Sequence, residues 1–218
     1  MEKFRIVAHR GGHGPYNENT FEAFKHAIDK GCGSVEMDLR FDHMNKRFYL
    51  EHDFLHSPKH KHNLVGKIVP NLPADIEYFV ELKTVAWLTK TYARNFLKEF
   101  RQYFKPEKTI VMSFNPFVLM QIRKLEPGIQ RGYLMGTFYW AFLFKTFFRR
   151  MIEPKILLLH KRLFNTDNVN FARSKGMKVM AFVLNDKDNW QKAVDYGIDG
   201  IITDRFAELD DFMKKKVV

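Results

Sequence analysis

Short apolar runs alternate along this chain with longer segments in which apolar residues recur every three or four positions. The short runs have the length and composition of β-strands. They are Arg5–Ala8, Ser34–Leu39, Arg47–His52, Tyr78–Lys83, Thr109–Phe114, Arg131–Met135, Lys155–Leu159, Lys178–Leu184 and Gly200–Thr203. The sequence therefore predicts nine strands, spread over nearly the whole chain.

The longer segments have the 3.6-residue period of amphipathic helices. The clearest is Asn19–Lys30, in which Phe21 and Phe24 share one face. We expect Asn19 and Glu22 to form a variant of the capping box at its start. The other predicted helices are Thr89–Phe104, Pro116–Leu125, Asp167–Lys175, Asp186–Tyr196 and Arg205–Lys216.

Strands that alternate with helices favour a parallel sheet, and eight such units close into a TIM (β/α)8 barrel. Nine predicted strands are one too many. The connection Asp42–Lys46 is too short for a parallel crossover, so Ser34–Leu39 and Arg47–His52 should form an antiparallel hairpin over the barrel mouth. We predict one barrel domain over residues 1–218, with a doubly wound open sheet as the alternative fold.

The composition is that of a globular protein with excess positive charge. The chain has 218 residues, with 36 Lys and Arg against 25 Asp and Glu, and a formal net charge of +11. This balance favours anionic partners: phosphate-bearing substrates, nucleic acid or an acidic membrane face. Cys32 is the only cysteine, and no apolar run has the length of a signal peptide or a membrane span. These features predict a cytoplasmic protein.

Two predicted strands carry acidic residues on a face that should point into the barrel. Alternation places Glu36 and Asp38 on one side of their strand. Glu81 and Lys83 share one side of another strand in the same way. Charges inside a barrel are costly unless they are paired or bind metal, and three carboxylates would form an all-oxygen site suited to Mg²⁺ or Ca²⁺. The alternative is that Glu81 and Lys83 form a surface pair on an edge strand.

Two histidines follow or end predicted strands. His9 comes directly after the first strand, where parallel α/β folds place active-site residues, and imidazole titrates near neutral pH. Arg10 beside it offers a guanidinium fork for a phosphate. If the hairpin turns around Asn45, cross-strand pairing places Asp38 opposite His52 on the same face. A carboxylate pair and a histidine should then meet at the mouth.

Seven short motifs follow one another along the chain. They are His9-Arg10-Gly11, Glu18-Asn19-Thr20, Glu36-x-Asp38, His52-Asp53, Glu81-x-Lys83, Ser113-Phe114 and Gly197-x-Asp199-Gly200-Ile201-Ile202-Thr203-Asp204. In residue types and order they resemble the glycerophosphodiester phosphodiesterase family, over nearly the whole chain. The resemblance implies a TIM barrel that hydrolyses glycerophosphodiesters to glycerol 3-phosphate and an alcohol, using a bound divalent cation.

The resemblance also implies roles for single residues. His9 and His52 match the catalytic histidines of the family, which exchange the roles of acid and base. Glu36, Asp38 and Glu81 match the ligands of the cation, Mg²⁺ or Ca²⁺.

Four further residues are implied around this centre. Arg10 and Lys83 match residues that contact the substrate phosphate. Asn19 belongs to the polar shell near the mouth, and Phe182 stands where the family has a tryptophan in the apolar wall. The segment Phe54–Val80 is shorter than the family's usual cap insertion, which implies a more open site.

Two stretches allow more than one interpretation. His52, His56, His60 and His62 lie among lysines, and we favour a solvated basic loop over a zinc site. Phe138–Phe148 is rich in aromatic residues and is followed by cations. It is either a helix packed on the barrel or an interfacial segment that makes peripheral membrane contact.

Several functions therefore remain open. The main expectation is a metal-dependent phosphodiesterase acting on a small-molecule glycerophosphodiester. Action on a lysolipid or another lipid phosphodiester, as in lysophospholipase D and sphingomyelinase D, would use the same residues. A basic membrane- or nucleic-acid-binding protein on a barrel scaffold is the non-enzymatic alternative. Because the cations are spread along the chain, we expect no nucleic-acid partner. A peripheral position at the inner membrane face would be compatible with the cytoplasmic location.

Overall fold

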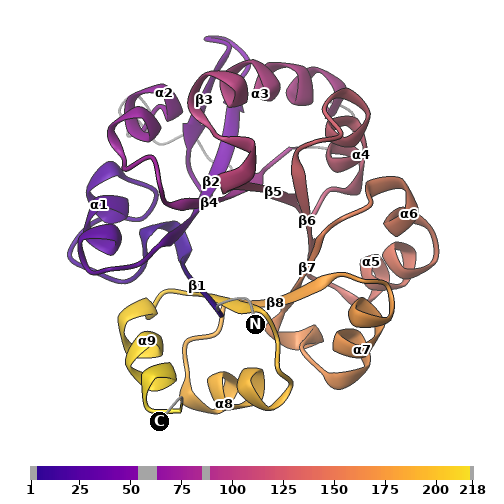
Figure 1. Ribbon diagram of the computed structural model, residues 1–218. Helices are drawn as coiled ribbons and strands as arrows, with labels where there is room; N and C mark the ends of the chain where they lie inside the picture. Colours follow the sequence, from indigo (N-terminus) through magenta and orange to yellow (C-terminus); the bar gives the residue numbers. More distant parts are fainter. Residues whose placement is uncertain (1–3, 54–62, 85–88, 217–218) are drawn as a thin grey trace.

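The computed structural model describes residues 4–53, 63–84 and 89–216, and a closed β-barrel forms its centre (Figure 1). Its eight parallel strands are β1 (Arg5–Ala8), β2 (Ser34–Asp42), β4 (Glu77–Leu82), β5 (Thr109–Ser113), β6 (Gln130–Met135), β7 (Ile156–His160), β8 (Lys178–Phe182) and β9 (Gly200–Thr203). Because β1 pairs with both β9 and β2, the sheet has no open edge there. The predicted TIM barrel is confirmed, and the doubly wound open sheet is wrong.

Helices surround the barrel in the order of the chain (Figure 1). They are α1 (Phe21–Asp29), α2 (Val65–Ile68), α3 (Thr89–Tyr103), α4 (Pro116–Leu125), α5 (Phe138–Leu143), the π-helical turn η6 (Phe144–Phe148), α6 (Arg149–Ile152), α7 (Thr166–Ser174), α8 (Lys187–Asp195) and α9 (Phe206–Lys214). None of the helices in the described residues is both long and apolar enough to cross a membrane.

Strand alternation produces two apolar layers. Residues such as Val7, Phe79 and Leu158 fill the inside of the barrel. Their neighbours, such as Val80 and Leu157, point outward and pack against the helices. Burial of both faces explains why the strands are continuous apolar runs in the sequence.

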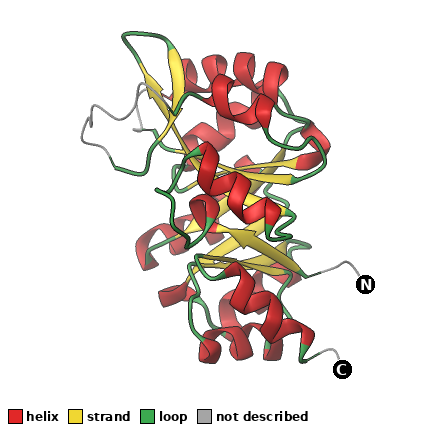
Figure 2. Ribbon diagram, turned by 90° about the vertical axis from the view of Figure 1, so that its left-hand side faces the viewer, coloured by secondary structure: helices red, strands yellow, loops and turns green. Residues whose placement is uncertain are grey.

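The hairpin forms as predicted, but its register differs by one residue. β3 (Arg47–Leu50) runs antiparallel to β2 and pairs Leu50 with Leu39. Asp38 therefore faces Glu51, whose N–H donates to the Asp38 carbonyl oxygen at 3.1 Å. The predicted pairing of Asp38 with His52 is wrong, because the observed register places Glu51 opposite Asp38 and His52 one residue further along. Figure 2 shows the hairpin projecting from the barrel, away from the two chain termini.

The start of α1 also differs from the prediction. Thr20 is the N-cap, and its side chain accepts a hydrogen bond from Ala23 N at 3.2 Å. The proposed capping box of Asn19 and Glu22 is wrong, because Asn19 is only 2% exposed and is hydrogen-bonded to Asp38 instead. The residue that looked like a cap thus belongs to the interior of the barrel mouth.

Candidate active site

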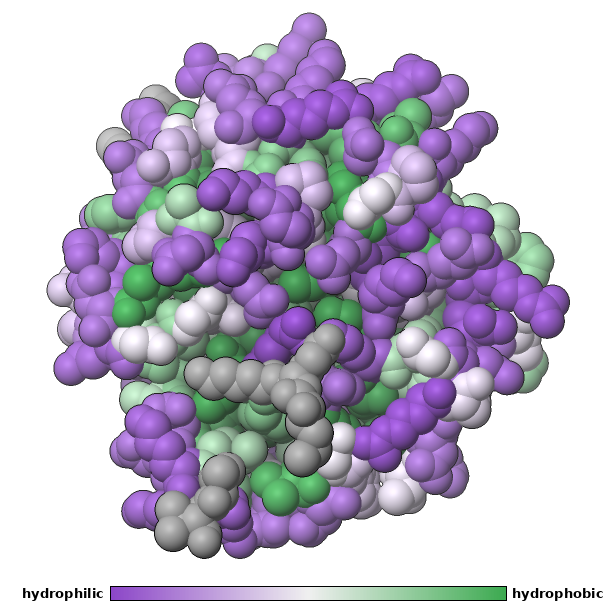
Figure 3. All heavy atoms as spheres, viewed as in Figure 1, coloured by the Kyte–Doolittle hydropathy of each residue, from purple (hydrophilic) through white to green (hydrophobic). Residues whose placement is uncertain are grey.

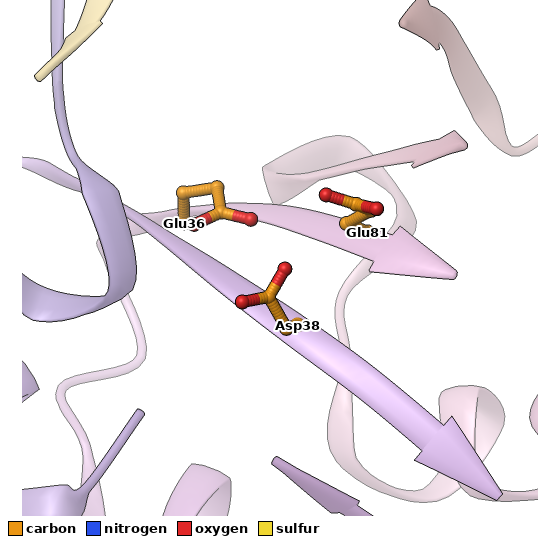
Figure 4. Close-up of side chains that lie close together, drawn as sticks. All are labelled: Glu36, Asp38 and Glu81. Carbon is orange, nitrogen blue, oxygen red and sulfur yellow. The ribbon is translucent and has the colours of Figure 1, made fainter. Parts of the chain in front are cut away.

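Three acidic side chains meet inside the barrel. Glu36 and Asp38 lie on β2, and Glu81 lies on the neighbouring β4, where it pairs with Asp38 in the strand register. All three are buried, and their potential ligand oxygens lie within 4.8 Å of one another. Figure 4 shows the three carboxyl groups pointing toward a common centre. The convergence expected from strand alternation is therefore present.

Two cations and an amide surround Asp38. Lys83 Nζ lies 3.1 Å from Asp38 Oδ1 and 2.8 Å from Glu81 Oε1. Arg10 Nε lies 2.9 Å from Asp38 Oδ2. Asn19 Nδ2 donates to the same oxygen at 3.0 Å, and Asn19 Oδ1 accepts from Asp38 N at 3.1 Å. Asp38 is thus the carboxylate at the centre of the charge network.

These surroundings shift the pKa values of the three carboxyl groups in opposite directions. Burial raises the pKa of Glu36 well above its usual range, and the charges of Asp38 and Glu81 add to the shift. Burial and the charge of Asp38 raise the pKa of Glu81 to about 7, against the opposing charge of Lys83. Burial also acts to raise the pKa of Asp38, but Lys83 and Arg10 outweigh it and lower this pKa. At neutral pH Asp38 is ionised, whereas the two glutamates hold protons more tightly than free glutamates do.

The acidic cluster fits a divalent cation. Asp38 Oδ1 is buried and accepts no hydrogen bond, although the Lys83 ammonium lies within ion-pair distance. When all three carboxyl groups are ionised, their charge exceeds that of Arg10 and Lys83, so a further cation would be attracted. Carboxylate oxygens are ligands that both Mg²⁺ and Ca²⁺ prefer, and the donor set does not select between them.

His9 stands at the carboxyl end of β1 and is oriented by Asp204, which follows β9. His9 Nδ1 lies 2.7 Å from Asp204 Oδ1, and Asn185 Nδ2 donates to Asp204 Oδ2 at 2.6 Å. Burial by itself would raise the pKa of Asp204, but the hydrogen bonds from His9 and Asn185 and the charge of His9 lower it. An ionised Asp204 favours the tautomer with its proton on Nδ1. Nε2 of His9 is then available for proton transfer.

A tight turn carries Arg10 from His9 to the acidic cluster. Arg10 and Gly11 have left-handed φ angles of 52° and 94°. A Cβ on Gly11 would lie 2.6 Å from the Cβ of Ala23 in α1, so a side chain does not fit here. Arg10 N donates to Glu36 Oε2 at 3.0 Å, and Arg10 Nη1 donates to both carboxylate oxygens of Glu18, at 2.9 and 3.0 Å. The guanidinium group is therefore held at the mouth, between the buried carboxylate of Asp38 and the exposed carboxylate of Glu18.

Comparison with known proteins places this arrangement in a family. The model of the glycerophosphoryl diester phosphodiesterase family matches residues 9–42 and 41–208. The chain belongs to this family. The match includes every residue of the acidic cluster and both predicted catalytic histidines, and it makes the chain a phosphoric diester hydrolase, as the sequence predicts.

Individual relatives agree with this membership. The chain is 24% identical over 245 residues to the glycerophosphodiester phosphodiesterase of Caldanaerobacter subterraneus subsp. tengcongensis, covering 98% of this chain and 99% of that protein. It is 22% identical over 273 residues to human lysophospholipase D GDPD1, covering 95% of this chain and 85% of that protein.

Solved structures show the same fold. An Oleispira antarctica phosphodiesterase in complex with the product sn-glycerol-3-phosphate superposes with a TM-score of 0.83 at 20% identity, covering 96% of each chain. The glycerophosphodiester phosphodiesterase of Thermotoga maritima superposes with a TM-score of 0.77 at 22% identity, covering 97% of this chain and 99% of that chain.

Two other predicted site residues, His52 and Phe182, lie at the rim of the barrel. The His52 side chain is 41% exposed, and its Nδ1 lies 3.0 Å from Asp53 Oδ1. Phe182, at the end of β8, lies four strands around the barrel from Glu81, and its ring contacts those of Phe114 and His160 at centroid distances of 5.7 and 5.6 Å. The roles assigned to both remain predictions. His56, His60 and His62 lie outside the described residues.

Sequence reasoning missed the side chains that orient His9. Asp204 belongs to the last of the seven motifs and Asn185 to none of them, and the motif order gives neither residue a place beside His9. Asn185 Oδ1 also accepts hydrogen bonds from Thr203 Oγ1 at 2.8 Å and from Asp204 N at 3.0 Å, which fixes the carboxylate. The available signal was barrel closure, which places the end of the last strand next to the end of the first.

Asn19 should contribute to stability as well as to the shape of the site. Replacing Asn19 with alanine removes two hydrogen bonds to Asp38 and leaves a non-glycine residue at a φ of 58°. We expect a loss of about 2 to 4 kcal/mol in the free energy of unfolding, because buried polar partners are left unsatisfied. Chemical denaturation measures this loss. Asn17→Ala, at an exposed position in the same loop, is the control and should change stability by less than about 0.5 kcal/mol. Equal losses in the two variants would contradict the role of Asn19.

Proposed function

We propose that this protein hydrolyses glycerophosphodiesters to glycerol 3-phosphate and an alcohol, with a divalent cation bound by Glu36, Asp38 and Glu81. The observation that carries the proposal is the meeting of three buried carboxyl groups, together with a histidine that an aspartate orients and whose neighbour Arg10 donates its N–H to Glu36. Family membership supports the reaction, and the donor set supports Mg²⁺ or Ca²⁺.

The residues around the cluster supply what a phosphodiester requires. A bound divalent cation would neutralise charge on the non-bridging phosphate oxygens. Arg10 and Lys83 add positive charge on the same side, and both already contact Asp38. A substrate phosphate would bind these two cations in place of their present carboxylate partners. Its phosphorus centre would then lie next to the acidic cluster.

Proton transfer is assigned to two imidazoles. His9 offers Nε2, because Nδ1 faces Asp204. In His52 the Nδ1 atom faces Asp53, so Nε2 is again the available nitrogen. One histidine would accept the proton of the attacking oxygen, and the other would donate a proton to the departing alkoxide. The contact of each imidazole with a carboxylate supports these roles of general base and general acid.

Turnover assays test the proposal directly. A panel of water-soluble glycerophosphodiesters should release glycerol 3-phosphate when Mg²⁺ or Ca²⁺ is present. EDTA should stop the reaction, and added cation should restore it. Undiminished release in EDTA would contradict a role for the cation, and the absence of release from every diester would contradict the reaction itself.

A lipid phosphodiester is a second candidate substrate, because an apolar cavity opens at the mouth. The cavity has a volume of about 360 Å³ and lies across the ends of β5, β6 and β7. Phe114, Leu134 and Trp140 supply its apolar wall. An acyl or alkyl group attached to the substrate would fit such a wall better than a small polar alcohol would. Faster turnover of lysophosphatidylcholine than of glycerophosphocholine would favour this substrate.

The cytoplasmic location expected from the single cysteine stays a prediction.

A further inference from the structure

Exposed aromatic side chains gather on one side of the barrel. Among the described residues, eight large apolar side chains are exposed, and six of them lie between the end of β5 and the end of η6. These six form what we call the aromatic face: Phe114 and Phe117 before and within α4, and Phe138, Tyr139, Phe142 and Phe147 on α5 and η6. Figure 3 shows a largely hydrophilic surface, with hydrophobic side chains at the rim where Figure 1 places α5 and α6.

Packing on the barrel explains only the inner side of this helical segment. Ala141, Phe144 and Phe148 are buried, and the Phe144 ring stacks on Tyr133 at a centroid distance of 4.3 Å. On the outer side Phe138 is 72% exposed and Phe142 is 65% exposed. These outer rings add little to the stability of the fold. Exposed apolar patches of this kind mark interaction sites.

The part of the chain that carries the aromatic face is strongly basic. Residues 108–166 contain ten Lys and Arg and two Asp and Glu, so they contribute +8 of the formal net charge of +11. Arg131 is buried, and the other nine cations are the ones that can act at the surface. Both acids already have partners: Glu126 lies 2.6 Å from Arg101, and Glu153 lies 2.5 Å from Arg123. The partner of this face should therefore be both apolar and anionic.

The face reaches the mouth of the barrel. The helices α4 and α5 begin just after the carboxyl ends of β5 and β6, so Phe117 and Phe138 lie near the active-site end. The exposed Lys161 and Arg162 follow β7 at the same end. Together with Trp140 they line the apolar cavity at the mouth. A planar partner on the aromatic face would therefore also meet these two cations.

We propose that the aromatic face docks on an anionic lipid surface. Phenylalanine and tyrosine rings on a helix too short to span a bilayer are suited to the headgroup region, and nearby Lys and Arg are attracted by anionic lipids. Docking would place the mouth at the lipid surface, which bears on the proposed lipid substrates. Binding itself does not depend on catalysis.

Co-sedimentation with lipid vesicles tests the docking. The full chain should bind vesicles in which one third of the phosphatidylcholine is replaced by phosphatidylglycerol, and should bind pure phosphatidylcholine vesicles about tenfold more weakly. The double variant Phe138→Ser/Phe142→Ser should bind the anionic vesicles at least about tenfold more weakly. Its control is Tyr16→Ser/Met44→Ser, which changes two exposed apolar residues outside the face and should bind as the unmodified chain does.

Variants that reverse charge measure how much the cations near the mouth contribute to vesicle binding. Lys161→Glu/Arg162→Glu should weaken binding to anionic vesicles by about tenfold or more. Arg94→Glu/Lys98→Glu makes the same charge change at exposed positions of α3, and should have a smaller effect. Release of glycerol 3-phosphate from a water-soluble diester in the absence of vesicles should be unchanged in Phe138→Ser/Phe142→Ser. Failure of docking is thereby distinguishable from failure of the proposed reaction.

Three results would overturn the proposal. The first is equal binding by the unmodified chain and the Phe138→Ser/Phe142→Ser variant. The second is the absence of any binding to anionic vesicles. The third is sedimentation of the chain as a dimer that these two substitutions dissociate, without vesicle binding, which would make the face a contact between two copies.

Discussion

Replacing His9 with alanine should lower kcat for glycerophosphodiester hydrolysis by about 10²- to 10⁴-fold, which is the usual effect of removing a general acid or base. The expectation depends on the contact of His9 Nδ1 with Asp204 at 2.7 Å, which leaves Nε2 for the substrate. His52→Ala should act in the same direction. Steady-state kinetics with saturating cation measure both effects.

Two further variants show whether the loss of activity is specific to His9 and to its orientation by Asp204. His43→Ala removes an exposed imidazole in the hairpin turn and should leave kcat unchanged. Asp204→Asn keeps the size of the side chain but favours the wrong tautomer of His9. It should lower kcat about 100-fold or more and alter the pH profile, with little change in KM. Full activity of His9→Ala would exclude His9 from proton transfer.

Removing one carboxylate from the acidic cluster should abolish stabilisation by divalent cations. A cation at about 100 times its dissociation constant stabilises a protein by about 2.7 kcal/mol, which for a chain of this length raises Tm by about 5 to 10 °C. In Glu36→Gln this rise should disappear. Without cation, Tm should be equal to or higher than that of the unmodified chain, because a buried carboxyl group with a raised pKa is replaced by a neutral group of the same shape. Thermal unfolding with and without Mg²⁺ or Ca²⁺ measures both values.

A matched control exists outside the cluster. Glu99 is half-buried, and its Oε1 accepts a hydrogen bond from Phe48 N at 3.1 Å, much as Glu36 accepts from Arg10 N. Glu99→Gln should retain the full rise in Tm with cation. A rise of the same size in Glu36→Gln would place the cation elsewhere.

The effect of cation should also depend on pH. Glu81 has a pKa of about 7 in the folded protein against a usual value of 4.5. The folded state therefore binds this proton more tightly than the unfolded state. The cation-free protein accordingly loses about 3 kcal/mol of stability from Glu81 as the pH rises from about 4.5 to 7. Because a bound cation requires the ionised carboxylate, the rise in Tm should be larger at pH 8 than at pH 6.

The strands and the inward direction of the acidic side chains follow from local rules. Residues two apart on a strand share a face, and this is true whatever the strand pairs with. Glu36, Asp38 and Glu81 were therefore expected on interior faces, and they lie there. The predicted helix Pro116–Leu125 has its observed bounds because Asn115 caps it and proline at the first position favours a start there.

The hairpin register required information that is not local. Its turn joins Asp42 and Arg47, and this pairing determines all the others on the two strands. A difference of one residue in the turn moved Glu51, not His52, to the position opposite Asp38. The role of Asn19 was hidden for a related reason, because its partner Asp38 lies on a strand that the loop meets only after folding.

The sequence by itself thus determined where the nine strands and six of the helices lie, how many units close the barrel, and which acidic side chains face inward, because these properties depend on neighbours within a few positions. The short helices α2 and α6 were not predicted. Only the tertiary structure decided which side chain orients His9, since Asp204 is 195 residues away and reaches it through closure of β9 on β1. It also decided that the aromatic residues of α5 and η6 divide into a buried and an exposed set. A segment that is apolar all round has no period from which to predict that division, and only packing against the barrel defines its two sides.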